Sequence, residues 1–267
     1  MENSELYKIY ERSAVAGNKI GMSNKVEIIK KNKETGVYER GIFKEKMHYG
    51  SKDNVMEAVV YRIAMILGVP CVRAIVIQHN GEIGSFSRYE IKELDKFIHL
   101  QEYFGVPEMH AEEFFKAIMG IKSNNVKNLF SMAYRYIMLD YLVGQQDRHM
   151  ENLAFTKERG GLEFYPLYDN GISFCGHMSN SLYRESLRSG KFQSRMGTSD
   201  EIYETLKGLR SRFKEVPINN IIRIGSINEE ILNNIIIEED RYNEIIAERR
   251  KDMIYSLMIR KEELLRL

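Results

Sequence analysis

The sequence predicts an α+β protein of two lobes, a small β-rich lobe at residues 1–90 and a larger, mainly helical lobe at residues 91–267. Two observations support this division. Short β-prone runs separated by turn residues fill most of the first 90 residues, with one helical pattern among them. Beyond residue 90, apolar residues recur at helical spacing over long segments. In a two-lobed chain we expect the binding site in the cleft between the lobes.

The small lobe begins with two expected strands, at residues 25–29 and 38–44, separated by a turn-rich segment. Two further strands are expected at 72–78 and 83–89. The turn signal His79-Asn80-Gly81 lies between them and predicts a hairpin.

One helix interrupts the strands. Between residues 54 and 67 the apolar side chains recur every three or four positions, which is the helical period. Asn54 is a suitable N-cap, Gly68 a suitable C-terminal stop, and Pro70 prevents the helix from continuing.

The large lobe is expected to be helical at residues 111–121, 126–143, 201–213 and 227–265, the last broken once or twice. Its charged C-terminal part is expected to be an amphipathic helix packed on the large lobe. Only residues 162–167 interrupt these helices, as an expected strand or hairpin.

Composition excludes several classes of protein. Lys plus Arg number 39 and Asp plus Glu 38, a net charge of +1, which argues against a dedicated nucleic-acid binder or a polybasic membrane-surface protein. No signal-peptide pattern opens the chain, and no apolar run approaches the roughly 20 residues of a membrane span. The two cysteines, Cys71 and Cys175, form no CxxC pair and are expected as small apolar residues in a reducing cytoplasm.

The densest group of polar residues is Gln145–Asn152, between an apolar helix and an apolar strand. Asp147 and Asn152 follow the spacing D-x-x-x-x-N, and Asp169 comes later, before a Gly turn. Phosphoryl transfer from ATP needs a carboxylate for the acceptor hydroxyl, together with oxygen ligands for Mg²⁺. Each residue alone is more often a turn residue or a cap; the order of the set makes the signal moderately specific.

The small lobe offers Lys44 as a phosphate contact and Glu57 as a carboxylate that could orient Lys44 through an ion pair. The alternatives are an edge-strand lysine and a capping box formed by Asn54 and Glu57. The small-residue segment 13–21 could bring backbone N–H groups close to phosphates, although it matches neither common glycine-rich motif.

The segment Leu139–His149, the following Asn152-Leu153-Ala154-Phe155 and Tyr168-Asp169 resemble the HipA-like Ser/Thr kinase family, and in particular its compact, cell-translocating members. Gly17–Ile20 and Asn54–Pro70 resemble the small-lobe loop and helix of that family. The resemblance covers roughly residues 13–174. It implies a two-lobed, protein-kinase-like fold.

The resemblance also implies a role for each matching residue. Asp147 would be the catalytic base, with Lys44 holding the α/β-phosphates and Glu57 positioning it. Asn152 and Asp169 would be the Mg²⁺ ligands. Nucleotide-binding residues would be Ser13, Ala16, Gly17, Asn18, Lys19, Lys44, His149, Tyr168 and a hinge formed by Ser87, Arg88 and Tyr89.

The sequence departs from the family at two places. The family's namesake has an extra N-terminal subdomain, whereas this chain starts close to the expected phosphate loop, which argues against a toxin–antitoxin pairing or operator binding by a complex. Met150-Glu151 replaces the small residues often found between His and Asn, which bears on acceptor access. Ser13 is either a site of autophosphorylation or a plain turn serine.

We therefore expect an ATP- and Mg²⁺-dependent Ser/Thr protein kinase. The alternatives are a kinase for a small-molecule or lipid hydroxyl on the same fold, and a non-catalytic nucleotide-binding module. The expected partners are ATP and a protein substrate of unknown identity, without direct nucleic-acid binding or a membrane. The chain is expected to be cytoplasmic, with translocation into another cell left open, and a monomer or weak oligomer.

Overall fold

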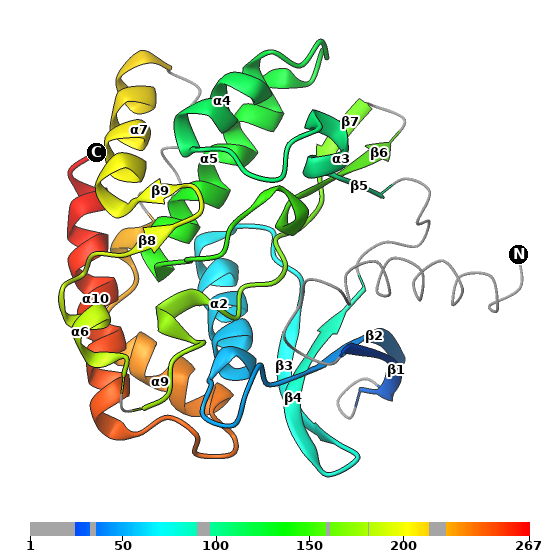
Figure 1. Ribbon diagram of the computed structural model, residues 1–267, viewed down its shortest axis with the longest axis vertical. Helices are drawn as coiled ribbons and strands as arrows, with labels where there is room; N and C mark the ends of the chain where they lie inside the picture. The colour runs from blue at the N-terminus through cyan, green and yellow to red at the C-terminus, as the bar shows by residue number, and fades with distance from the viewer. Residues whose placement is uncertain (1–24, 33–35, 90–96, 159–160, 181, 214–222) are drawn as a thin grey trace, which may run out of the picture.

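The computed structural model describes residues 25–32, 36–89, 97–158, 161–180, 182–213 and 223–267. Figure 1 shows a β-sheet formed by the N-terminal region at one side and a helical C-terminal part at the other, with helix α2 between them. The predicted α+β class is confirmed, and so is the arrangement of a sheet-bearing N-terminal part before a helical part. The boundary at residue 90 stays a prediction, since one continuous apolar core joins α2 to the helices that follow.

The N-terminal sheet is antiparallel and has the strand order β1-β2-β4-β3. Its strands are β1 (Lys25–Lys31), β2 (Tyr38–Glu45), β3 (Ala74–His79) and β4 (Glu82–Arg88). All four lie within two residues of the predicted ranges. The predicted hairpin is also confirmed. His79 pairs with Glu82 across a two-residue turn in which Asn80 and Gly81 both have positive φ, the conformation that Asn-Gly turns favour.

Helix α2 (Asp53–Leu67) ends as predicted, with Gly68 in the left-handed conformation at φ 65°. Its start differs from the prediction. Lys52, not Asn54, occupies the N-cap position, and Asn54 lies inside the helix with its side-chain amide donating to Glu244 at 2.7 Å. The capping-box alternative for Asn54 and Glu57 is therefore wrong, and Glu57 is free for another role.

The helical part contains the predicted helices together with shorter elements that periodicity did not indicate. The helices are α3 (Leu100–Phe104), α4 (Ala111–Met119), α5 (Val126–Val143), α6 (Arg184–Arg188), α7 (Ser199–Arg212), α9 (Glu229–Glu239) and α10 (Ala247–Leu265), with the 3-10 turns η2 (Met150–Asn152) and η3 (Ser173–Cys175). The strands are β5 (Phe97–His99), β6 (Ala154–Glu158), β7 (Gly161–Phe164), β8 (Gln193–Ser194) and β9 (Gly197–Thr198). The predicted strand at 162–167 is correct only as far as Phe164, which pairs with Phe155.

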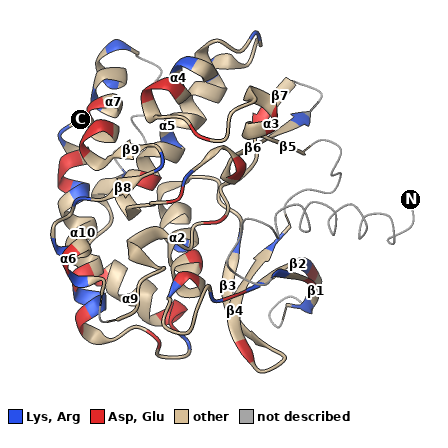
Figure 2. Ribbon diagram, in the orientation of Figure 1, with Lys and Arg blue, Asp and Glu red and all other residues tan. Residues whose placement is uncertain are grey.

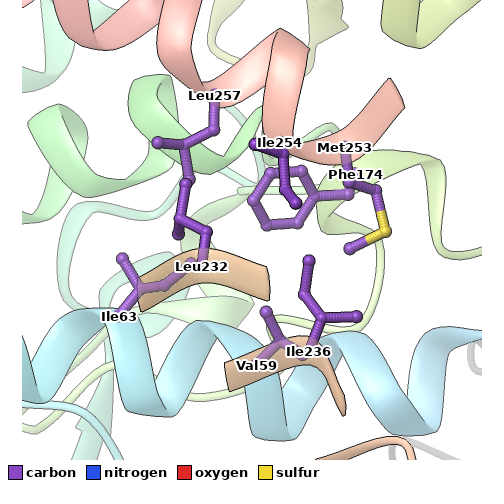
Figure 3. A pocket seen from close by; sticks show the side chains of 8 residues that line it. All are labelled: Val59, Ile63, Phe174, Leu232, Ile236, Met253, Ile254 and Leu257. Carbon is purple, nitrogen blue, oxygen red and sulfur yellow. The ribbon is translucent and has the colours of Figure 1, made fainter. Parts of the chain in front are cut away.

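The core centres on α5, whose C-terminal half is buried on every side. Where α2, α9 and α10 meet, apolar side chains converge on a small gap that also contains the Phe174 ring (Figure 3). The gap is lined by Val59, Ile63, Phe174, Leu232, Ile236, Met253, Ile254 and Leu257. It contains no polar side chain and does not admit a water molecule, so it is part of the core and offers no chemistry.

Helix α10 packs on the helical part as predicted, but two of its arginines are completely buried. Arg249 donates to the carbonyls of Cys175 at 2.8 Å and Met178 at 2.7 Å. Arg260 donates to those of Leu142 at 2.8 Å and Gly190 at 3.2 Å. Burial lowers the pKa of each guanidinium to about 10, so both remain charged at neutral pH. Arg249 thus anchors the segment that follows Asp169, and Arg260 ties the end of α5 to Gly190.

Figure 2 shows basic and acidic residues interspersed along the helices of this part, as the near-zero net charge suggests. Within the described residues, no helix combines the length and the apolar character needed to cross a bilayer. Cys71 and Cys175 are both free thiols, as predicted.

Candidate active site

The loop between α5 and β6 contains the predicted base and one predicted metal ligand. Helix α5 ends at Gly144, whose φ of 63° is a left-handed conformation that glycine adopts without strain. The buried Gln145 side chain then makes two bonds. Its amide donates to the Asp169 carbonyl at 3.2 Å, and its Oε1 accepts the Asp147 N–H at 3.1 Å. One side chain therefore ties the loop of Asp147 to the loop of Asp169.

Arg148 lies at the centre of the site and is completely buried. Its Nε and Nη2 donate to the two carboxylate oxygens of Asp140 at 2.8 and 2.9 Å. Nη1 donates to the carbonyls of Asn152 at 3.1 Å and Tyr168 at 2.9 Å. Nη2 also donates to Asn170 Oδ1 at 2.6 Å. The planar guanidinium thus holds the two loops in one fixed relation.

Asp147 presents its carboxylate at the edge of this network, with 29% of the side chain exposed. Oδ1 accepts a hydrogen bond from Arg195 Nε at 2.5 Å. Oδ2 lies 3.8 Å from His149 Nε2, too far for a hydrogen bond. The Asn152 amide donates to the Asp147 carbonyl at 2.9 Å and fixes the backbone beneath it. Among the described residues, the hydrogen bonds to this carboxylate go to Oδ1 alone.

Lys44 and Asp169 meet between the sheet and the helical part. Alternation along β2 buries Phe43 and puts Lys44 on the opposite face, where its ammonium forms a salt bridge with Asp169 Oδ1. Lys25 lies directly opposite Lys44 in the β1–β2 register, and its Nζ is 3.8 Å from Asp169 Oδ2. Like charges placed across a strand pair repel, so the carboxylate between these lysines stabilises the arrangement.

Burial alone would lower the pKa of Lys44, yet the negative charges of Asp169 and Glu57 raise it above its ordinary value of 10.5. Burial alone would likewise raise the pKa of Asp169, but Lys44 and Lys25 hold it well below 3.8. Both groups are therefore charged at neutral pH.

Glu57 lies behind this pair on α2 and is buried. Its Oε1 accepts the N–H of Asn170 at 3.1 Å, while Oε2 is buried without a hydrogen-bond partner. Burial raises its pKa, and the Lys44 charge opposes this effect. No salt bridge links Glu57 to Lys44 within the described residues, because Lys44 pairs with Asp169 instead. Glu57 thus acts on Lys44 through its charge and on the Asp169 loop through a hydrogen bond.

The residues expected to hold Mg²⁺ offer suitable atoms. Asp169 contributes a carboxylate. Because Asn152 Nδ2 is bonded to the Asp147 carbonyl, its amide oxygen is the group left for a metal. Groups of three or more His, Cys, Asp or Glu side chains able to hold a metal are absent from the described residues. The two oxygen donors of Asp169 and Asn152 fit Mg²⁺, which usually takes one or two protein oxygens and completes its shell with phosphates and water.

His149 lies in the loop between α5 and β6, and Tyr168 bonds to that loop. The Tyr168 hydroxyl donates to the Glu151 carbonyl at 2.6 Å, and His149 Nδ1 accepts the Glu151 N–H at 3.3 Å. His99, which the sequence did not indicate, faces the Tyr168 hydroxyl at 3.1 Å. Burial lowers the pKa of both histidines, so both imidazoles are neutral at pH 7. His149 and Tyr168 are thus both joined to Glu151 of this loop, and their contact with a nucleotide stays a prediction.

The expected hinge lies at the end of β4. The N–H of Arg88 donates to the Arg73 carbonyl at 2.9 Å and that of Tyr89 to the Arg40 carbonyl at 3.0 Å. Ser87 pairs with Ile42 and Ala74 inside the sheet. The backbone N–H groups of Arg88 and Tyr89 are therefore already hydrogen-bonded and not available to the adenine ring of a nucleotide. The predicted loop residues Ser13, Ala16, Gly17, Asn18 and Lys19 lie outside the described residues.

A family model described as the HipA-like C-terminal domain matches residues 18–232 of this chain. The chain belongs to the HipA-like C-terminal domain family. The match includes the N-terminal sheet, α2, the loop that contains Asp147 and the loop that contains Asp169. No curated protein sequence matches the chain.

Two solved structures have similar folds. One is the proinflammatory kinase CtkA of Helicobacter pylori, with a TM-score of 0.67 and 14% identity over 91% of this chain and 89% of that one. The other is HipA of Shewanella oneidensis MR-1, in its complex with HipB and operator DNA, with a TM-score of 0.56 and 14% identity. The match covers 92% of this chain and 63% of that HipA chain. Family and fold together support a kinase-like function, as the sequence motifs predicted.

Besides His99, three charged residues of the site were missed from the sequence. Lys25 becomes visible only with the β1–β2 register, which puts it beside Lys44. Arg148 belongs to the quoted motif, but its role depends on the carboxylate of Asp140, eight residues earlier. Arg195 carries no local signal, because it reaches Asp147 from a hairpin 48 residues away.

Proposed function

We propose that this protein is an ATP-dependent Ser/Thr protein kinase that transfers the γ-phosphate to a protein hydroxyl. The observation that supports this most is the Lys44–Asp169 pair between the sheet and the helical part, tied through Gln145 to the loop of Asp147. A phosphate-binding cation, a metal-binding carboxylate and an open carboxylate base are the parts that phosphoryl transfer requires.

In this proposal Asp147 Oδ2 orients the acceptor hydroxyl and takes its proton as the new O–P bond forms and the bond to the ADP oxygen breaks. Lys44, with Lys25 beside it, exchanges the Asp169 carboxylate for phosphate oxygens. Asp169 and Asn152 would hold Mg²⁺, which would supply charge neutralisation at the phosphates. Catalysis then comes from positioning and charge stabilisation, because the fixed groups need little reorganisation.

The test is incubation with γ-labelled ATP, Mg²⁺ and protein or peptide acceptors that contain Ser or Thr. Asp147→Ala should lower incorporation at least ~10²-fold, because the base and its orienting effect are both lost. Asp200→Ala is the matched control, since Asp200 is an exposed carboxylate paired with Lys191 at the start of α7. Equal incorporation by wild type and Asp147→Ala would overturn the role of Asp147.

The same experiment separates the two alternatives. Transfer to small alcohols or lipids, but to none of the peptides, would replace the protein acceptor. Calorimetric binding of ATP and Mg²⁺ without transfer to any acceptor would instead indicate a nucleotide-binding module.

A further inference from the structure

Arg195 is presented to the site by a rigid two-residue turn between β8 and β9. The pairing of Ser194 with Gly197 closes this turn, and its backbone is anchored on two sides. The Arg195 N–H donates to the Gln146 carbonyl at 3.2 Å, and the Met196 carbonyl accepts the N–H of Ala111 at 2.9 Å. The Met196 side chain is buried. The turn is therefore tied both to the catalytic loop and to the start of α4.

The Arg195 guanidinium is shared between two carboxylates. Its Nε donates to Asp147 Oδ1 at 2.5 Å, and its Nη1 forms a salt bridge with Glu108. Among the described residues the hydrogen bond from Arg195 to Asp147 goes to Oδ1, while Nη1 is engaged by Glu108. Asp147 Oδ2 lies 3.8 Å from Nε2 of the neutral His149. Arg195 therefore holds one oxygen of the base and leaves the other open. If Arg195 blocked Asp147, its guanidinium would instead bind Oδ2, the oxygen that faces the acceptor hydroxyl in the proposed function.

We propose that Arg195 is a positioning residue for the base, fixing the Asp147 carboxylate through Oδ1 so that Oδ2 faces the acceptor hydroxyl. This inference rests on the kinase function proposed above. A carboxylate held at one oxygen cannot rotate freely about its terminal torsion, and a misplacement of about 1 Å costs up to ~10²-fold in rate. Glu108 acts one step further out by orienting Arg195 itself.

The kinetic test compares Arg195→Ala and Arg195→Lys with wild type. We expect Arg195→Ala to lower kcat about 10-fold and to leave the KM for ATP within about twofold, because the loss is one of orientation and not of nucleotide binding. Arg195→Lys keeps the charge and should recover part of kcat. Arg188→Ala is the matched control, because Arg188 is also half-exposed and paired with one carboxylate, Asp252, at 2.9 Å.

Unchanged kcat in Arg195→Ala would overturn the proposal. A higher kcat would overturn it too, by showing that Arg195 obstructs the base.

A crystal structure of Arg195→Ala supplies a readout that does not depend on activity. We expect the Asp147 carboxylate to occupy more than one orientation, while Arg188→Ala leaves it in one. A single unchanged orientation in Arg195→Ala would overturn the proposal even in an inactive protein. Absence of transfer by the wild type, by contrast, would refute the kinase function alone.

Discussion

The buried ion pair of Asp140 and Arg148 predicts a large effect for a small substitution. Asp140→Asn keeps the size and shape of the side chain but removes its charge. The amide can still accept one bond from Arg148, while its NH₂ group is turned toward the other guanidinium donor. The three bonds from Arg148 to Asn152, Tyr168 and Asn170 remain possible, so the variant isolates the charge.

The burial of the ion pair sets the size of the expected loss in stability. The Asp140 side chain is 6% exposed and that of Arg148 is 0% exposed. An exposed ion pair contributes about 0–1 kcal/mol. Removal of one partner from a buried pair costs about 3–5 kcal/mol, because the remaining charge keeps its desolvation penalty and loses its counter-charge. Since Asn keeps one acceptor, we expect the free energy of unfolding to fall by about 3 kcal/mol, the lower end of that range.

Urea denaturation followed by far-UV circular dichroism measures this loss, because the chain has no Trp to report by fluorescence. Glu112→Gln is the control, since Glu112 pairs with Lys116 on the exposed face of α4 and its loss should leave the unfolding free energy indistinguishable from wild type. A loss below about 1 kcal/mol for Asp140→Asn would refute the reasoning, because the pair would then behave as a surface pair.

Three further predictions concern the same region. Asp169→Asn should be less stable than wild type by about 1–2 kcal/mol at pH 7. This difference should shrink below about pH 4, because a carboxyl with a lowered pKa loses its contribution to stability as it protonates. Urea denaturation of both proteins between pH 7 and pH 2 measures the difference, and a difference that stays constant over this range contradicts the prediction. Burial raises the pKa of the Cys71 and Cys175 thiols, so neither should react with Ellman's reagent at pH 8 until the protein unfolds, and rapid labelling of folded protein would disprove this. Gly176→Ala puts a Cβ 2.0 Å from a backbone carbonyl oxygen, so the free energy of unfolding should fall by about 1–3 kcal/mol and phosphotransfer should drop with it. Gly208→Ala, with open space around its Cβ, should by comparison be neutral or stabilising, and equal effects of the two substitutions would contradict the packing argument.

Much of the fold could be predicted because its signals are local. The Asn80-Gly81 turn, the Gly68 stop and the helical periods of α5 and α7 each depend on the backbone preferences of a few neighbouring residues. The short elements β5, α3 and α6 could not be predicted in this way, because five residues or fewer show no period. The start of α2 was misplaced because Asn54 bonds to Glu244, which is 190 residues away.

The candidate site, like the fold, has features that local sequence predicts and features that only the tertiary structure shows. The sequence by itself determined the family, the α+β class and the order of Asp147, Asn152 and Asp169, because these follow from motif spacing and local pattern. Only the tertiary structure decided that Lys44 pairs with Asp169 instead of Glu57 and that Arg195 donates to Asp147.

The tertiary structure likewise decided that α10 buries Arg249 and Arg260 against backbone carbonyls. The sequence predicts that this helix packs on the large lobe, but not that two of its arginines lie on the packed side. The physical reason is common to these cases. A backbone conformation depends on its neighbours in sequence. The partner of a charge depends on whatever the fold brings within about 4 Å of it, wherever in the chain that group lies.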